Sequence, residues 1–163
     1  MNIAGNVAEA PEYRIEVLHP SFDSFGLVLD LLSRHPPFAE WPLQRLAKAI
    51  RKQLRVGNQL AALSASDDLL AYAGWVPSLQ ASAELWMDNR GPLQVLEEGG
   101  DARAVTIFVS THPLVTKALV RHGRVMNPDV RWYFKRTYGG QLRPSRKDTV
   151  QGWGTTASGA DNS

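Results

Sequence analysis

The sequence predicts an α/β domain of the α+β layered kind, with helices flanking a mixed central sheet. Three observations indicate this class. Residues 40–77 combine an amphipathic helix pattern with a two-stranded hairpin pattern, and residues 103–110 form a short β-branched run typical of a buried strand. A helix pattern that opens at Pro113 then leads to a last strand pattern, and such a crossover predicts two parallel neighbouring strands.

The first two elements follow from apolar periodicity. Apolar and polar residues alternate over 12–19, which predicts a strand, and apolar residues recur at helical spacing over 22–34. His35 precedes two prolines, which remove backbone donors and disfavour helical geometry in the residue before them. We therefore expect the first helix to end there.

A second helix is predicted to begin at Pro42, a favourable first helical residue, and to end at Gly57-Asn58, which tolerate left-handed backbone. Its two faces differ sharply in character. Leu43, Leu46, Ala47, Ile50 and Leu54 form the apolar face, and Arg45, Lys48, Arg51, Lys52 and Arg55 form the basic one. This pattern is typical of a helix that packs on a core and exposes its cations.

The hairpin follows this helix directly. We expect strands over 59–65 and 69–76, with a turn at 66–68 that is rich in serine and aspartate. Pro77 is expected to close the second strand against further pairing, because proline lacks the backbone donor of a ladder.

The second half of the chain predicts a helix over 78–87 and a short helical turn over 93–98. The buried strand 103–110 comes next, then a helix from Pro113 to about His122 with Leu114, Ala118 and Leu119 facing inward. Residues 130–138 mix aromatic and basic side chains in a pattern that suits a strand.

The length of 163 residues and the 44% apolar share predict one domain, over 13–147, with flexible tails at 1–12 and 148–163. The chain has no cysteine, which excludes disulfides and thiolate zinc sites, and four scattered histidines make a metal site unexpected. No apolar run reaches the ~18 residues that a membrane span needs, and no signal peptide is visible. We therefore expect a cytoplasmic protein.

Charge is distributed unevenly along the chain. Residues 117–147 contain one acid, Asp129, and the following basic residues: Lys117, Arg121, Arg124, Arg131, Lys135, Arg136, Arg143, Arg146 and Lys147. Such a segment attracts an anionic partner, whether a nucleic acid, an acidic protein, a phosphate-bearing cofactor or a membrane surface.

The motifs Trp41-Pro42 and Ala71-Tyr72, with Trp75 three residues later, resemble those of the RTX toxin-activating lysine acyltransferases, the haemolysin-activating C proteins. The resemblance covers roughly residues 25–140. It implies a GNAT-like single domain that moves a fatty acyl group from acyl carrier protein to a lysine ε-amine of a protein substrate.

In that family the chemistry relies on a histidine just before Trp-Pro and on an aspartate in the central strand. This chain has Phe38 and Ile107 at those places. His35, three residues before Phe38, and Asp101, before the central strand, are the candidate catalytic replacements. The alternative interpretations are that His35 only ends a helix and that Asp101 is a turn residue.

The usual coenzyme A signature R/Q-x-x-G-x-G/A is represented only by a fragment at residues 121–124, which disfavours coenzyme A as the donor. We expect no bound cofactor and an acyl-acyl carrier protein donor. Arg121, Arg124 and Arg131 are the candidate substrate-binding residues for its phosphopantetheine arm. Besides the carrier and the protein substrate, a second copy of the chain is a candidate partner, as a homodimer.

Two alternatives to the acyltransferase stand beside it. One is a noncatalytic relative that binds an acyl chain or a protein, which the residues at Phe38 and Ile107 favour. The other is a nucleic-acid-binding protein that uses residues 131–136, whose aromatic and basic side chains suit stacking and phosphate contacts. Alternation along a strand would divide those side chains between two faces, so this hypothesis ranks third.

Overall fold

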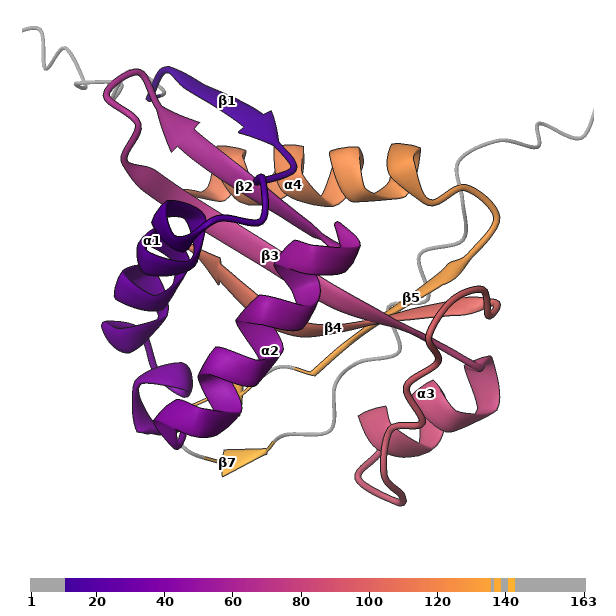
Figure 1. The fold of residues 1–163 in the computed structure, drawn as a ribbon. Helices are drawn as coiled ribbons and strands as arrows, with labels where there is room; N and C mark the ends of the chain where they lie inside the picture. The colour runs from indigo at the N-terminus through magenta and orange to yellow at the C-terminus, as the bar shows by residue number, and fades with distance from the viewer. Residues whose placement is uncertain (1–10, 136, 139–140, 143–163) are drawn as a thin grey trace, which may run out of the picture.

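The computed structural model describes residues 11–135, 137–138 and 141–142 (Figure 1). Its central feature is a five-stranded sheet in the order β1-β2-β3-β4-β5. The strands are β1 (Tyr13–Glu16), β2 (Gln59–Ser64), β3 (Leu69–Ser78), β4 (Ala102–Ser110) and β5 (Arg131–Phe134). Strands β1 to β4 pair antiparallel, and β5 pairs parallel to β4. The predicted α+β class and the predicted parallel last pair are thus confirmed.

Four α-helices flank this sheet: α1 (Phe22–Ser33), α2 (Leu43–Val56), α3 (Gln80–Met87) and α4 (Pro113–Met126). Helices α1 and α2 lie on one face, α4 crosses the opposite face, and α3 lies beside the start of β4 (Figure 1). A short 3-10 turn, Phe38–Glu40, joins α1 to α2. Two further short strands, β6 (Thr137–Tyr138) and β7 (Gln141–Leu142), pair with each other.

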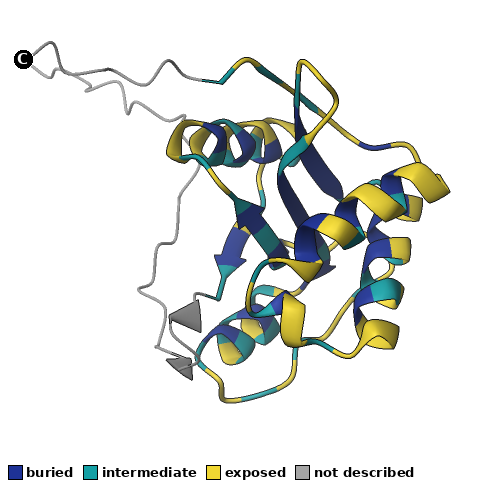
Figure 2. Cartoon of the chain, turned by 90° about the vertical axis from the view of Figure 1, so that its left-hand side faces the viewer, coloured by how far each residue is buried: buried dark blue, intermediate teal, exposed yellow. Residues whose placement is uncertain are grey.

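The sheet separates two apolar cores. On the α1/α2 face, Tyr72 and Ile107 of the sheet pack with Leu32, Ile50 and Leu54 of the helices. The opposite core, on the α4 face, is a separate cluster; its members include Leu60, Trp75, Val105, Leu119 and Trp132. Figure 2 shows the consequence: the strands are buried, and the helices expose their outer faces. The three inner strands, β2, β3 and β4, therefore contribute side chains to both cores.

Local signals explain the helix boundaries. The side chain of Ser21 accepts a hydrogen bond from Ser24 N and caps α1. Helix α2 ends at Gly57, whose φ of 74° is the left-handed conformation expected of that glycine. The predicted helices are confirmed, although Leu43 and Leu114, expected to face inward, are exposed because each lies in the first turn of its helix, at the edge of the core.

Two expectations about residues 77–98 are wrong. Strand β3 continues through Pro77, which pairs with Arg103 of β4. The Pro77 carbonyl accepts from Leu96 N on the side away from β4, so its missing donor costs no ladder bond. Residues 93–98 form no helix, because their backbone bonds to other elements: Ser78 Oγ donates to Gln94 O, besides the Leu96 bond.

The predicted last strand, 130–138, is also divided: β5 ends at Phe134, and β6 belongs to a separate pair. The tails predicted at 1–12 and 148–163 lie outside the described residues except for Pro11 and Glu12, as do Arg136 and residues 143–147.

A β-bulge interrupts the pairing of β3 with β4. Gly74 pairs with Ile107 and Trp75 pairs with Val105, so Thr106 has no partner opposite it. Val105 packs in the α4-side core and Ile107 in the α2-side core, and the Thr106 hydroxyl contacts Gln53 of α2. The bulge thus turns two consecutive side chains, Thr106 and Ile107, toward α2.

Candidate functional site

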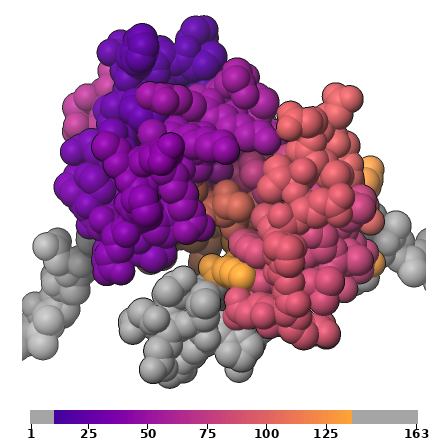
Figure 3. Space-filling model, turned by 60° about the horizontal axis from the view of Figure 1, so that its bottom comes forward, coloured from indigo at the N-terminus to yellow at the C-terminus, as the bar shows by residue number. Residues whose placement is uncertain are grey.

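A cleft lies between α2 and the β3–β4 pair, with an open volume of about 710 Å³. We call it the α2 cleft. Its walls come from α2, β3, β4 and the connection before β4, and Figure 3 shows it as a hollow between the indigo-to-purple helices and the pink segment. The lining residues are Trp41, Arg45, Ala49, Lys52, Gln53, Val56, Asn58, Trp75, Val76, Pro77, Leu96, Glu97 and Thr106.

A directed chain of hydrogen bonds forms the polar floor of the α2 cleft. Tyr72 Oη donates to Gln53 Oε1 at 3.1 Å, and Gln53 Nε2 donates to Thr106 Oγ1 at 3.1 Å. Because the Thr106 oxygen accepts from Gln53, its own hydroxyl hydrogen is free to donate elsewhere. Thr106 lines the cleft, so the chain ends in a donor at the cleft floor.

Burial keeps the first member of this chain protonated. Tyr72 is fully buried, and desolvation raises its pKa far above the ordinary value of 10.0. Its hydroxyl therefore stays a donor to Gln53 across the physiological range. The chain runs from Tyr72 through Gln53 to Thr106, and each residue donates to the next.

Gly74 makes room for the chain. A Cβ at this position would lie 2.0 Å from Gln53 Oε1 and 2.5 Å from Gln53 Nε2. The Gln53 side chain is itself buried and bonded at both ends of its amide, so it has no space to retreat. Only glycine lets the amide cross this strand so closely.

The rim of the α2 cleft is basic and partly aromatic. The Arg45 guanidinium lies 3.9 Å from the centre of the Trp41 ring, a cation–π contact. Lys52 Nζ of α2 lies 3.5 Å from Oε1 of Glu97, which belongs to the connection that precedes β4. The exposed cations of α2 extend this basic rim along the helix, and a basic surface favours an anionic ligand.

Part of the edge of β4, next to the cleft, has no strand partner among the described residues. Among the described residues, β5 pairs with β4 only from Ala102↔Arg131 to Val105↔Phe134, while β4 continues to Ser110. The unpaired edge begins at Thr106, the same residue that ends the hydrogen-bond chain. An extended ligand arm can add to such an edge by strand-type hydrogen bonds.

His35 lies at the end of α1 and does not line the cleft. Its Nδ1 is 2.7 Å from the Leu31 carbonyl oxygen, which only accepts, so Nδ1 carries the proton and Nε2 of the neutral ring is the basic nitrogen. Phe38 and Ile107, at the places of the family's histidine and aspartate, are buried in the α2-side core. Phe38 packs edge-on against Trp41 at 5.1 Å, one layer behind the cleft wall.

Asp101 lies just before β4, beside α3. Its Oδ1 accepts from Gln80 N at 2.8 Å, at the start of α3, and its carbonyl accepts from Arg131 N at 3.0 Å. Helices α1 and α3 lie at opposite ends of the sheet in Figure 1, so the structure does not bring His35 and Asp101 together. Asp101 joins α3, β4 and β5 instead.

The three candidate arginines are separated as well. Arg121 is exposed on α4 and Arg131 is exposed at the start of β5, whereas Arg124 is half-buried against the α4 face of the sheet. Trp132 and Tyr133 are buried, so in the described part of residues 131–136 these two rings are not on the surface for base stacking.

Sequence reasoning did not identify Gln53 or Thr106. The signal for Gln53 was present: it lies three residues after Ile50, on the apolar face of α2, where a polar side chain is unusual. No such signal marked Thr106 in the sequence, because the β-branched pattern of residues 103–110 does not reveal where a bulge will form. Among the described residues no three histidine, aspartate or glutamate side chains group to hold a metal ion. No helix in this part of the chain is long and apolar enough to cross a membrane.

Comparisons with known proteins give the following. No protein-family model matches the sequence, and no curated protein sequence matches it significantly. The fold is similar to that of a GNAT family N-acetyltransferase, YhbS from Escherichia coli in complex with CoA, at 17% identity and a TM-score of 0.46. That match covers 72% of this chain and 57% of YhbS, so the chain spans little more than half its length.

Two further solved structures resemble the chain. A probable acetyltransferase matches at 16% identity over 76% of this chain and 80% of its own, with a TM-score of 0.49. A histone acetyltransferase HPA2 and related acetyltransferase from Corynebacterium glutamicum matches at 15% identity, over 79% and 78%, with a TM-score of 0.48. With identities and scores this low, the likeness carries no conclusion about activity or ligands.

Proposed function

We propose that the protein is an acyltransferase that moves a fatty acyl group from acyl carrier protein to an amine of a protein substrate. The observation that carries the proposal is the hydrogen-bond chain that ends in the Thr106 hydroxyl. This donor sits at the cleft floor, at the residue where the free edge of β4 begins. A thioester arm laid along that edge brings its carbonyl beside a prepositioned donor.

The reaction needs little beyond placement. The amine nitrogen attacks the thioester carbonyl, forming the C–N bond, and the developing oxyanion accepts a hydrogen bond from Thr106. Glu97, the carboxylate of the cleft lining, takes the proton that the amine loses. The C–S bond then breaks, and the thiolate receives this proton from Glu97 and leaves as the thiol.

The basic face of α2 supports an acidic carrier as the donor. Arg45 and Lys52 line the cleft, and Lys48, Arg51 and Arg55 continue the charge along the same helix. A surface of one sign speeds encounter with a partner of the other sign. Acyl carrier protein as donor also places the reaction in the cytoplasm, and a bound cofactor is unnecessary to it.

The test is transfer from long-chain acyl carrier protein, followed by intact-mass analysis of candidate acceptor proteins. Thr106→Val keeps the shape and removes the hydroxyl, and we expect a rate loss of about 10²- to 10³-fold. Thr106→Ser should retain most activity. Thr116→Val, which removes a hydroxyl bonded to His112 O on α4, is the matched control and should behave as wild type.

His35→Ala belongs in the same series. A rate unchanged by His35→Ala excludes this histidine as the base and leaves Glu97→Gln as the decisive variant. Equal rates for Thr106→Val and wild type would refute the proposed oxyanion donor.

The burial of Phe38 and Ile107 favours a second function, a noncatalytic relative that binds an acyl chain or a protein in the same cleft. Both side chains belong to the core, where they support the fold and cannot exchange a proton. Saturable binding of acyl carrier protein without any transfer to an acceptor would establish this second function over the first.

A further inference from the structure

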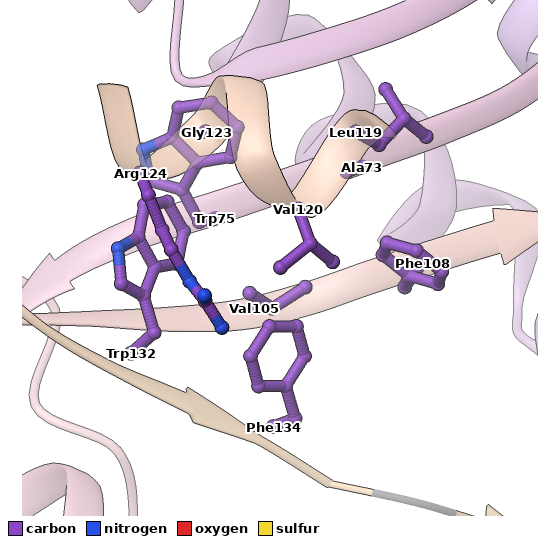
Figure 4. A pocket seen from close by; sticks show the side chains of 10 residues that line it. All are labelled: Ala73, Trp75, Val105, Phe108, Leu119, Val120, Gly123, Arg124, Trp132 and Phe134. Carbon is purple, nitrogen blue, oxygen red and sulfur yellow. The ribbon is translucent and has the colours of Figure 1, made fainter. Parts of the chain in front are cut away.

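The hollows on the two faces of the sheet differ in the room that they offer. The hollow on the α4 face has about 20 Å³ of space for water-sized groups, and one water needs ~10–15 Å³ (Figure 4). Three buried donors in its walls, Trp75 Nε1, Trp132 Nε1 and Arg124 Nε, have no acceptor among the described residues. The α2 cleft has about 210 Å³ of such space, so of the two only this cleft has room for an organic ligand.

One side of α2 faces the α2 cleft. Its members are Arg45, Ala49, Lys52 and Val56, and steps of four, three and four residues place them above one another on a helix. Lys48, the other lysine of α2, is exposed and does not line the cleft. The two amines of α2 therefore differ: Lys52 lies in the cleft, and Lys48 faces solvent.

A carboxylate accompanies the Lys52 amine. Nζ lies 3.5 Å from Glu97 Oε1, and the two side chains are 36% and 90% exposed, so solvent weakens their attraction. An ammonium has no lone pair and must lose a proton before it can attack a carbonyl carbon. Glu97 is placed to accept that proton, and a pair so open to solvent does not hold the amine in one position.

The Thr106 hydroxyl belongs to the same cleft. Gln53, the residue after Lys52, donates to Thr106 Oγ1 at 3.1 Å, and Lys52 and Thr106 both line the cleft. The flexible four-carbon stem of a lysine lets its nitrogen reach different positions within such a space. The α2 cleft thus contains an amine, a carboxylate and a hydroxyl donor, the three groups that acyl transfer from a thioester uses.

We propose that Lys52 is a site of self-acylation, where the protein takes a fatty acyl group from a thioester bound in the α2 cleft. The ammonium first passes one proton through Glu97 to water, which leaves the neutral amine. Nζ then attacks the thioester carbonyl carbon and forms the C–N bond, and Glu97 takes the second proton. The C–S bond breaks, and the thiolate receives this proton and leaves as the thiol. The inference rests on the proposed acyl transfer and adds an acceptor within the chain.

Self-acylation changes the cleft. The amide carries no charge, so the ion pair with Glu97 is lost and this side of α2 has one cation fewer. The acyl chain lies against the apolar part of the lining, which includes Val56, Val76 and Leu96. It then occupies the place of the next thioester, so self-acylation limits further transfer.

The first experiment incubates the wild-type chain with long-chain acyl carrier protein and no other acceptor. Cleavage after glutamate yields the peptide 41–84, which carries both Lys48 and Lys52, and tandem mass spectrometry assigns the acyl group to one or the other. We expect at least tenfold more acylation at Lys52 than at Lys48. Random chemical acylation favours the more exposed Lys48, so equal or greater acylation there would overturn the proposal.

Two glutamine variants test the proton acceptor. Glu97→Gln removes the carboxylate beside Lys52, and Glu98→Gln removes the next carboxylate along the chain, which does not line the cleft. We expect Glu97→Gln to slow Lys52 acylation about tenfold or more and Glu98→Gln to change it less than twofold. Equal slowing in both variants would contradict the step assigned to Glu97.

Preincubation tests the effect on later transfer. Wild-type protein treated with acyl carrier protein should transfer to an acceptor more slowly than untreated protein, whereas treatment should not slow Lys52→Arg, which has no lysine amine in the cleft. Lys117→Arg, an exposed lysine of α4, is the control and should respond as wild type does. Equal slowing of Lys52→Arg and wild type would contradict the limiting effect.

The outcomes separate this inference from the proposed function. Transfer to protein acceptors with Lys52 unmodified refutes self-acylation alone, and acylated Lys52 without any acylated acceptor refutes the protein substrate alone. If acyl carrier protein modifies neither, S-octanoyl-N-acetylcysteamine, a thioester that needs no carrier contact, decides. Selective acylation of Lys52 by this donor supports the inference and refutes only the carrier, and acylation that does not prefer Lys52 overturns the inference.

Discussion

The buried polar groups on the two faces of the sheet differ in whether they have hydrogen-bond partners. On the α2 face, Tyr72, Gln53 and Thr106 satisfy one another in a chain that leaves one hydroxyl hydrogen for the cleft. On the α4 face, the indole and guanidinium donors have no acceptor among the described residues. Hydrogen bonds within the protein stabilise the fold, whereas a buried donor without an acceptor lowers its stability. Hence stability should depend more on the first set than on the second.

Gly74→Ala should have the largest effect, because the new Cβ would lie 2.0 Å from the Gln53 amide and break both of its bonds. We expect the free energy of unfolding to fall by about 3 kcal/mol. Gly26→Ala is the control: it lies within α1 with nothing within 4 Å of the new Cβ, and should raise stability by about 0.5–1 kcal/mol. Urea titration measures both, and equal effects would contradict the close approach at Gly74.

Gln53→Met should cost somewhat less, about 2 kcal/mol. The substitution keeps the volume and removes the amide, so the buried Tyr72 hydroxyl loses its acceptor and Thr106 loses its donor. In the Gly74→Ala background the loss should be smaller, because that change has already broken the same bonds. A double-mutant cycle measures this coupling, and strict additivity would show that the two residues act separately.

Tyr72→Phe should cost about 1 kcal/mol at pH 7 and change the response to alkali. Burial raises the pKa of Tyr72, so above its ordinary value of 10.0 the unfolded chain releases a proton that the folded protein keeps. The contribution of the Tyr72 hydroxyl to the free energy of unfolding is therefore fully present below pH 10. Above pH 10 it falls by up to about 1.4 kcal/mol for each pH unit. Melting curves between pH 9 and 11 should show a shallower decline for Tyr72→Phe than for wild type.

Arg124→Met should have the smallest effect on stability, within about 0.5 kcal/mol of wild type, because it removes a buried donor that has no partner in the described structure. The same change on the α2 face, Gln53→Met, is expected to be costly. Thermal melts of the two methionine variants side by side test the contrast directly. A loss of 2 kcal/mol or more in Arg124→Met would show that the α4 face is also a closed network.

Most of the fold was predictable, because its determinants are local. The end of α2 at Gly57 and the strand pattern of 103–110 depend on propensity and periodicity within one short segment. The errors arose where distant backbone groups decide the conformation. Nothing near Pro77 reveals that its carbonyl will accept from Leu96, and this bond both extends β3 and prevents the helical turn expected over 93–98.

The site was less predictable than the fold. The family resemblance predicted His35 and Asp101 as catalytic residues. The two lie at separate places in the fold, and their roles in catalysis stay predictions. Among the three candidate arginines, charge alone could not distinguish Arg124, which enters a hollow, from Arg121 on the surface. The distinction depends on which side of α4 meets Trp132, a contact between residues on different elements.

Because of the bulge at Thr106, β4 has one residue more than the alternation of its side chains between the two faces of the sheet requires. Side chains alternate regularly between the two cores if Thr106 is left out, since Val105 and Phe108 pack on the α4 side and Ile107 and Val109 on the other. Loss of Phe108 or Val109 instead would disturb the alternation that fills the two cores. Position 106 is therefore where β4 can change in length and still fill both cores, so the geometry of the cleft floor can vary independently of the fold.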